Sequence, residues 1–168
     1  NAMIHSDNIF FADIAMHTGT AEFYGFCQQL GMDRAIPSDV PVSRPGITNS
    51  GEFETIKVLA DSGYGQGEIL ITPLQMASLF ASLTNGGTIY SPAMVRSVCR
   101  TVGREYETVR ETQPTPWISG AITGDVLEKV EPLLRLVVSE GTAQSIDVDG
   151  LDVHGKTGTA QIGDDRTR

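Results

Sequence analysis

Seven apolar residues late in the chain recur at the spacing of a single helix face. They are Val126, Leu127, Val130, Leu133, Leu134, Val137 and Val138. This spacing predicts an amphipathic helix over 126–138 whose apolar side packs on a core. Pro132 lies inside the pattern and has no backbone N–H to donate, so we expect a kink or a break there. Gly141 is predicted to end the helix.

A second helix is predicted from its own start signals at Thr72-Pro73. Thr72 can cap the helix, Pro73 suits the first helical position, and Gln75 can reach back to complete a capping box. Apolar residues then surround most of the helix, which predicts that it is buried on all sides. These residues are Leu74, Met76, Ala77, Leu79, Phe80 and Leu83.

Two shorter helices are predicted near the N-terminus. The first covers residues 8–17, with Asn8 as its N-cap and Gly19 as its stop. The second begins with Thr20 as its cap and ends at Gly31. Its apolar residues are assigned to the core, and they are Phe23, Phe26, Cys27 and Leu30.

Strands are predicted in two hairpins. The first pairs 94–102 with 105–110 around Gly103, and the second pairs 146–148 with 151–153 around Asp149-Gly150. Residues 113–117 form a Pro-rich connection. A chain of 168 residues is long enough for one domain with a core. We therefore predict a mixed α/β (α+β) domain.

A long irregular connection is predicted over residues 33–68, with one short element near 56–59. A connection of this length in a compact domain is typical of a lid or of a segment that lines a site. It contains the sequence "GYGQG" at 63–67. No strand precedes this run and its glycine spacing is not that of a phosphate-binding loop, so we interpret it as a structural turn.

Composition and charge exclude several functions. The net charge of -9 disfavours nucleic acid as a partner, because phosphates require basic patches. No apolar run approaches the roughly 20 residues that span a bilayer. Cys27 and Cys99 lack metal-ligand spacing and are predicted to be buried thiols. The three histidines lie far apart in the sequence, and we predict no metal site.

The stretch "HGKTGTAQ" follows the second predicted hairpin. Gly155 and Gly158 leave room for a ligand along a strand edge. Lys156 supplies a positive charge, and Thr157 and Thr159 supply hydroxyls. Together they suit a ligand with a carboxylate that pairs like an added strand.

A second motif, Ser6-Asp7-Asn8, precedes the first predicted helix, 150 positions before Lys156. S-D-N followed by K-T-G resembles the active-site motifs of β-lactamases and penicillin-binding proteins. The stretches "GYGQGEILITPLQMASLFASLTNGGTIYSPAMV" and "VVSEGTAQ" also resemble the transpeptidase domain of high-molecular-weight penicillin-binding proteins. The resemblance extends from Ser6 to Gln161. It implies the β-lactamase/transpeptidase-like fold, here its helical part and part of its antiparallel sheet.

The resemblance implies a role for each matching residue. Ser6 relays a proton between nucleophile and leaving amine, and Asn8 binds the substrate's amide carbonyl. Lys156 maintains positive potential around Ser6 and the substrate carboxylate. The backbone N–H of Thr159 is one oxyanion donor. The implied substrate-binding residues are Thr157, Gly158 and Thr159. Asp7, the variable middle residue, is solvated or caps the helix.

Two departures from the family pattern indicate a partial domain. The family's S-x-x-K motif, which holds the acylated serine, is absent, because no serine lies three positions before Lys57, Lys129 or Lys156. The family also continues beyond K-T-G with strands and a C-terminal helix, whereas this sequence stops at Arg168. We therefore expect residues 1–2 to be a tag remnant. Residues 3–168 are expected to be part of a penicillin-binding transpeptidase domain.

The implied activity is that of a serine D,D-transpeptidase that crosslinks peptidoglycan stem peptides and is acylated by β-lactams. It needs no metal or organic cofactor. The parent is expected at the extracytoplasmic face of the bacterial plasma membrane, anchored by an N-terminal helix and working with cell-wall synthesis proteins. The fragment itself is expected to be inactive and to self-associate or pack loosely.

Four alternatives remain at this point: a class A serine β-lactamase, a β-lactam sensor, a non-catalytic penicillin-binding-like domain, and a purely structural module. The 150-position gap, the long intervening helices and the lack of an E-x-x-x-N segment count against the β-lactamase. Slow deacylation with signalling would distinguish a sensor from a transpeptidase.

Overall fold

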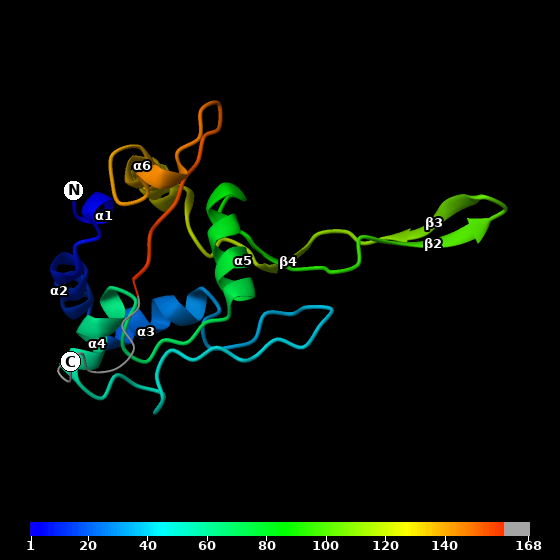
Figure 1. The fold of residues 1–168 in the computed structure, drawn as a ribbon. Coiled ribbons are helices and arrows are strands. Elements are labelled where there is room, and N and C mark those ends of the chain that lie inside the picture. Colours follow the sequence, from blue (N-terminus) through cyan, green and yellow to red (C-terminus); the bar gives the residue numbers. More distant parts are fainter. Residues whose placement is uncertain (160–168) are drawn as a thin grey trace, which may run out of the picture.

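The computed structural model describes residues 1–159 and combines helices with two small antiparallel sheets (Figure 1). The helices are α1 (Ala2–His5), α2 (Asn8–Thr18), α3 (Thr20–Gln29), α4 (Ile56–Gly63), α5 (Pro73–Thr84) and α6 (Gly124–Ser139), followed by a 3-10 turn, η1 (Gln144–Ile146). The strands are β1 (Ile89–Ser91), β2 (Ser97–Val102), β3 (Glu105–Glu111) and β4 (Thr115–Ile118). The predicted mixture of helix and antiparallel strand is confirmed.

Helices α2, α3 and α4 share one core with the irregular segment between α3 and α4. Gly63 lets α4 approach α2 closely, since a Cβ there would lie 2.5 Å from the carbonyl oxygen of Phe11. Cys27 is buried in this core, and burial raises the pKa of its thiol to about 11. Cys99, by contrast, is exposed on β2, so the prediction of two buried thiols is right only for Cys27.

The first two helix caps differ from the prediction by one position. Asp7, not Asn8, caps α2, because its Oδ1 accepts hydrogen bonds from the N–H groups of Ile9 (3.0 Å) and Phe10 (3.2 Å). Asn8 is therefore the first residue of the helix. Gly19, not the expected Thr20, holds the cap position of α3.

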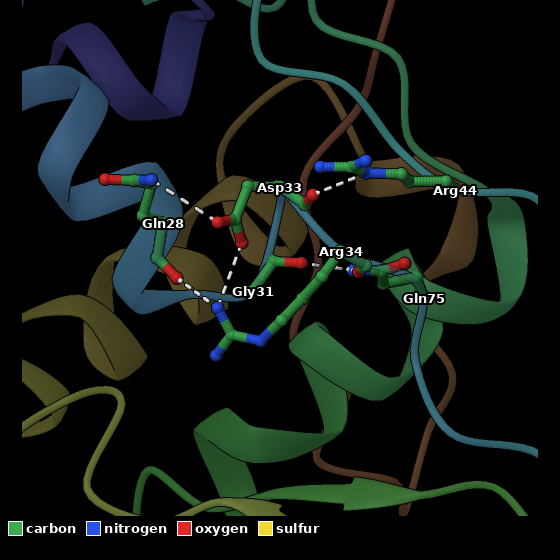
Figure 2. A network of polar contacts seen from close by, with 6 residues as sticks. All are labelled: Gln28, Gly31, Asp33, Arg34, Arg44 and Gln75. Atoms are coloured by element: carbon green, nitrogen blue, oxygen red, sulfur yellow. Dashed lines mark hydrogen bonds and ion pairs between the residues drawn. The ribbon is translucent and has the colours of Figure 1, made fainter.

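Helix α5 begins as predicted, with the Thr72 hydroxyl accepting a hydrogen bond from the Gln75 N–H at 3.2 Å. The predicted second bond of the capping box, from the Gln75 side chain back to the start of α5, does not form. The Gln75 side chain turns inward and donates to the carbonyl oxygens of Gly31 (2.7 Å) and Arg34 (3.2 Å) (Figure 2). Both carbonyls follow α3, and the Gly31 carbonyl otherwise accepts only a long local bond, from the Arg34 N–H at 3.4 Å.

The prediction that α5 is buried on all sides is also wrong. Its fully buried side chains are the polar Gln75 and Ser82, whereas Met76 is 36% exposed and Phe80 is 41% exposed. Phe80 and Leu83 face a cavity described below.

The hairpin of β2 and β3 is confirmed and projects away from the helices with both faces exposed (Figure 1). Gly103 takes a positive φ of 66° in its turn. Residues 113–117 are not simply the predicted connection, because β4 begins within them and pairs with β1. Ile89 of β1 is buried against Ile36 and Ala121 in a second core.

Helix α6 passes through Pro132 without a break, so of the predicted kink or break the second is wrong. Proline leaves the carbonyl of Glu128 without its helical donor. Pro132 and Glu128 are both exposed, so water can satisfy this carbonyl.

The second predicted hairpin does not form. Its turn is present, with the Leu151 N–H bonded to the Val148 carbonyl at 3.1 Å, but the flanking residues are not strands. Arg135 of α6 competes for them, because it donates to the Val153 carbonyl at 3.3 Å and forms an ion pair with Asp147 at 3.0 Å. In the part of the chain that the structure describes, no helix is both long and apolar enough to cross a membrane.

Candidate active site

Ser6 lies at the junction between α1 and α2 in a left-handed backbone conformation, with φ 54° and ψ 51°. It is the only non-glycine residue with positive φ in the described part of the chain. Such a conformation is uncommon for serine and persists only where surrounding contacts hold it. Here the Ser6 N–H bonds to the Met3 carbonyl, and the Asp7 N–H bonds to the Ala2 carbonyl at 2.9 Å.

Lys156 reaches Ser6 across 150 positions of sequence. Its Nζ donates to Ser6 Oγ at 2.7 Å and to the Thr157 carbonyl at 2.9 Å. The ammonium is partly buried, and desolvation lowers the pKa of Lys156. The two motifs singled out in the sequence therefore meet at one hydroxyl.

Thr142 holds both motifs in place. Its N–H donates to the Ile4 carbonyl at 3.2 Å, two residues before Ser6, and its hydroxyl lies 2.6 Å from that of Thr157. Sequence reasoning does not assign Thr142 a role. The available signal is its place in "VVSEGTAQ", one of the stretches that carry the family resemblance.

The K-T-G-T segment runs beside α6 as extended chain. The Gly155 N–H bonds to the Leu134 carbonyl at 3.3 Å, and the space where a Gly155 Cβ would lie is 3.4 Å from Ile146 and 3.6 Å from Val138. No strand partner for 154–159 is found within residues 1–159. Gln161, the last residue of the quoted motif, lies outside the described residues.

The motif residues open onto a cavity of about 920 Å³. Its polar lining holds every predicted site residue: Ser6, Asn8, Lys156, Thr157, Gly158 and Thr159. Its apolar lining comes from the N-terminal helices, α5 and α6: Met3, Phe11, Phe80, Leu83, Val130 and Leu134. The structure thus brings all six predicted residues to one surface.

Tyr64 also lines this cavity, although the sequence assigns its turn only a structural role. Its hydroxyl donates to Asp61 at 2.7 Å, and Lys57 forms an ion pair with the same carboxylate. These two partners lower the pKa of Asp61, with the Lys57 hydrogen bond contributing most. The ionised carboxylate fixes the direction of the Tyr64 ring.

The arrangement suits anion binding and proton relay. Lys156 donates to Ser6 Oγ, so the Ser6 hydroxyl proton remains free for another acceptor. The ammonium and the hydroxyls of Thr157 and Thr159 border the same cavity, which matches the chemistry of a carboxylate ligand.

Known proteins share both the sequence and the fold. The chain is 29% identical over 164 residues to "Penicillin-binding protein 3" of Bacillus subtilis (strain 168), which covers 96% of this chain and 23% of that protein. It is 27% identical over 171 residues to "Peptidoglycan D,D-transpeptidase PbpA" of Mycolicibacterium smegmatis, covering 98% of this chain and 32% of that protein. The chain therefore spans about a quarter to a third of the length of these curated relatives.

Two solved structures have the same fold. A D,D-transpeptidase domain of a peptidoglycan glycosyltransferase from Eggerthella lenta superposes with a TM-score of 0.82 at 22% identity, over 96% of this chain and 41% of that one. PBPA from Mycobacterium tuberculosis gives a TM-score of 0.82 at 23% identity, over 96% and 37%. The family model "Penicillin binding protein transpeptidase domain" matches residues 1–168. Sequence motifs, site geometry and fold agree, and the chain belongs to the penicillin-binding protein transpeptidase domain family.

Proposed function

We propose that the cavity is part of the active site of a serine D,D-transpeptidase that crosslinks peptidoglycan stem peptides. The observation that carries the proposal is the hydrogen bond from Lys156 Nζ to Ser6 Oγ at 2.7 Å. It joins the lysine of one family motif to the serine of the other, over a cavity with room for a peptide end. The relatives named as transpeptidases support the same reaction.

The acylated serine belongs to an S-x-x-K segment outside these 168 residues. Its Oγ attacks the carbonyl carbon between the two terminal D-alanines of a stem peptide. An ester C–O bond forms, the peptide C–N bond breaks, and D-alanine leaves. The amine of a second stem peptide then attacks the ester, forming a new C–N bond and returning a proton to the serine.

Ser6 acts in both steps as a proton relay. Its hydroxyl carries the proton from the attacking serine to the departing amine, and carries it back when the second amine attacks. Lys156 favours this transfer by holding a positive charge beside Ser6 Oγ, where negative charge would otherwise be costly. Asn8 binds the substrate's amide carbonyl from the first turn of α2.

The substrate's terminal carboxylate binds between Lys156, Thr157 and Thr159. Thr142 orients the Thr157 hydroxyl through the 2.6 Å contact between the two side chains. Gly158 keeps the edge open, because the space where a side chain would stand holds no other atom within 4 Å. The Thr159 N–H is the oxyanion donor from this segment. A β-lactam presents an amide and a carboxylate in similar positions and acylates the same serine.

The complete protein acts on the outer side of the bacterial plasma membrane, where its substrate lies, and is anchored by an N-terminal helix. Its partners are peptidoglycan strands and the proteins that assemble the cell wall. The 168-residue piece alone is inactive and either self-associates or packs loosely, because apolar side chains line an open cavity in the described part of the chain.

Lys156→Ala in the complete protein tests the assignment. Loss of a preorganised charge at the reacting centre is expected to slow acylation by a fluorescent penicillin by about 10²–10³-fold. Lys129→Ala is the matched control, because Lys129 is an exposed lysine on α6 outside the cavity lining. Acylation that slows less than about threefold would remove Lys156 from the site. Crosslinking of a donor stem peptide to an amine acceptor, followed by mass spectrometry, separates a transpeptidase from a sensor.

A further inference from the structure

The turn that ends α4 delivers a side chain to the K-T-G-T segment. Gln66 Nε2 donates a hydrogen bond to the carbonyl oxygen of Thr159 at 3.3 Å, across 93 positions of sequence. Gln66 lies in "GYGQG", which the sequence identifies as a turn at the start of a stretch that carries the family resemblance, without a role for Gln66 itself. The contact links that turn directly to the residue proposed to face the substrate.

The backbone of the turn fixes where Gln66 points. The Gln66 N–H bonds to the Asp61 carbonyl at 2.9 Å, and the Gly65 N–H bonds to the Ser62 carbonyl at 3.1 Å. This pair of bonds, with Gly65 at φ 85°, is a Schellman motif at the C-terminal end of α4. The left-handed position explains why glycine stands immediately before Gln66.

The turn is also held on its far side. Gly67 has φ 74°, and a Cβ there would lie 2.9 Å from Ser62 Oγ and 3.2 Å from the Val58 carbonyl oxygen. Glu68 then accepts a hydrogen bond from the Asn49 N–H at 2.8 Å. Gln66 is half-buried between these fixed points, so the position of its backbone relative to Thr159 is set by the turn.

The Thr159 carbonyl that Gln66 contacts belongs to the part of the chain that borders the cavity. Gly158 and Thr159 are exposed, and residues 156–159 line the cavity. A ligand that pairs with this edge as an added strand would donate an amide N–H to an outward carbonyl. A carbonyl oxygen has two lone pairs, so the Thr159 oxygen can accept from Gln66 and from a ligand together.

We propose that Gln66 is a positioning residue that holds the Thr159 carbonyl ready to accept an amide N–H of the substrate. This inference rests on the proposed function, because it assumes that 154–159 is the substrate-binding edge. Gln66 does not touch the reacting bond. It restricts rotation of the peptide group that follows Thr159, so that the ligand's donor meets a fixed acceptor.

The test compares two classes of β-lactam on the complete protein. A penicillin carries a side-chain amide N–H that can donate to the Thr159 carbonyl, whereas a carbapenem carries no such amide. Gln66→Met keeps the length of the side chain and removes the donor. We expect it to slow penicillin acylation about fivefold, the typical value of one hydrogen bond, and carbapenem acylation less than about twofold. Gln66→Glu also removes the donor and places a negative charge beside the Thr159 carbonyl oxygen, so it should slow penicillin acylation at least as much as Gln66→Met.

Gln29→Met is the matched control. Gln29 also donates its side-chain amide to a distant backbone carbonyl, that of Ala121 at 3.0 Å, but it lies outside the cavity lining. It should leave acylation by both compounds unchanged. Equal slowing of penicillin and carbapenem by Gln66→Met would mean a merely structural role and would overturn the inference. Unchanged rates with both compounds would overturn it too. A wild-type protein that neither compound acylates would instead refute the proposed function itself.

Discussion

Gly141→Ala is predicted to move Ser6 away from Lys156 and so to separate the two motifs of the active site. Gly141 follows α6, and a Cβ at this position would overlap the carbonyl oxygen of Ile4 and lie 2.8 Å from that of Val137. These neighbours are backbone atoms, so they cannot rotate away as a side chain could. The backbone of Gly141 itself does not have positive φ, so alanine adds a steric conflict without backbone strain.

The loss of stability can be worked out from the contacts that the alanine would displace. Overpacking of a tight contact costs about 1–3 kcal/mol. The Ile4 carbonyl accepts the Thr142 N–H at 3.2 Å, and loss of that hydrogen bond adds about 1 kcal/mol. We therefore expect the free energy of unfolding of the domain to fall by about 2–4 kcal/mol. Because Ile4 stands two residues before Ser6, its displacement also moves Ser6 away from Lys156, and we expect penicillin acylation to slow at least about tenfold.

Urea denaturation and penicillin acylation of the complete protein measure the two effects. Gly25→Ala is the control, since Gly25 lies inside α3 and, apart from the local helix backbone, no atom lies within 4 Å of the position that a Cβ would take there. Alanine there should stabilise the protein by up to about 1 kcal/mol through helix propensity and leave acylation unchanged. If Gly141→Ala unfolds at the same urea concentration as the wild type, the steric reasoning is wrong.

Two further predictions concern the charge on Lys156 and the isolated chain. Burial lowers the pKa of Lys156 from its ordinary value of 10.5, so acylation should fall at alkaline pH with a midpoint below that value, and Lys156→Arg should shift the midpoint upward. An alkaline midpoint of the acylation rate that is the same in Lys156→Arg as in the wild type would contradict this. The 168-residue chain alone should form no covalent adduct with a labelled penicillin by mass spectrometry, because it lacks the S-x-x-K serine. The same preparation should show light scattering that rises with concentration, and a strict monomer would exclude self-association.

Sequence signals correctly predict helix starts and tight turns, because these depend on a few adjacent residues. Thr72-Pro73 starts α5, and Gly103 turns the exposed hairpin. The errors occur where a distant group competes. Gln75 leaves its capping box for the Gly31 carbonyl, and Arg135 binds the segment that was expected to form a second hairpin.

The site is predictable only in part, for the same reason. The two motifs identify Ser6 and Lys156 as residues that should meet, but the contact depends on the chain path through α6. Thr142 and Gln66 have no motif of their own, and each bonds to a segment far away in sequence, Thr142 to Ile4 and Gln66 to Thr159. Their roles follow from geometry that residue type and spacing do not contain.

The apolar residues of α5 surround most of the helix, although only part of its surface is buried in this chain. One side of the helix packs on the core through Leu79, while Phe80 and Leu83 line the cavity beside the motifs. Phe80 is 41% exposed, which is a large fraction for a residue in so apolar a helix. Under the proposed function, the helix that carries the acylated serine must approach Ser6 and Lys156. The apolar side of that helix would then cover Phe80 and Leu83 of α5. We therefore expect the pattern of α5 to reflect burial in the complete domain, where both sides of the helix are covered.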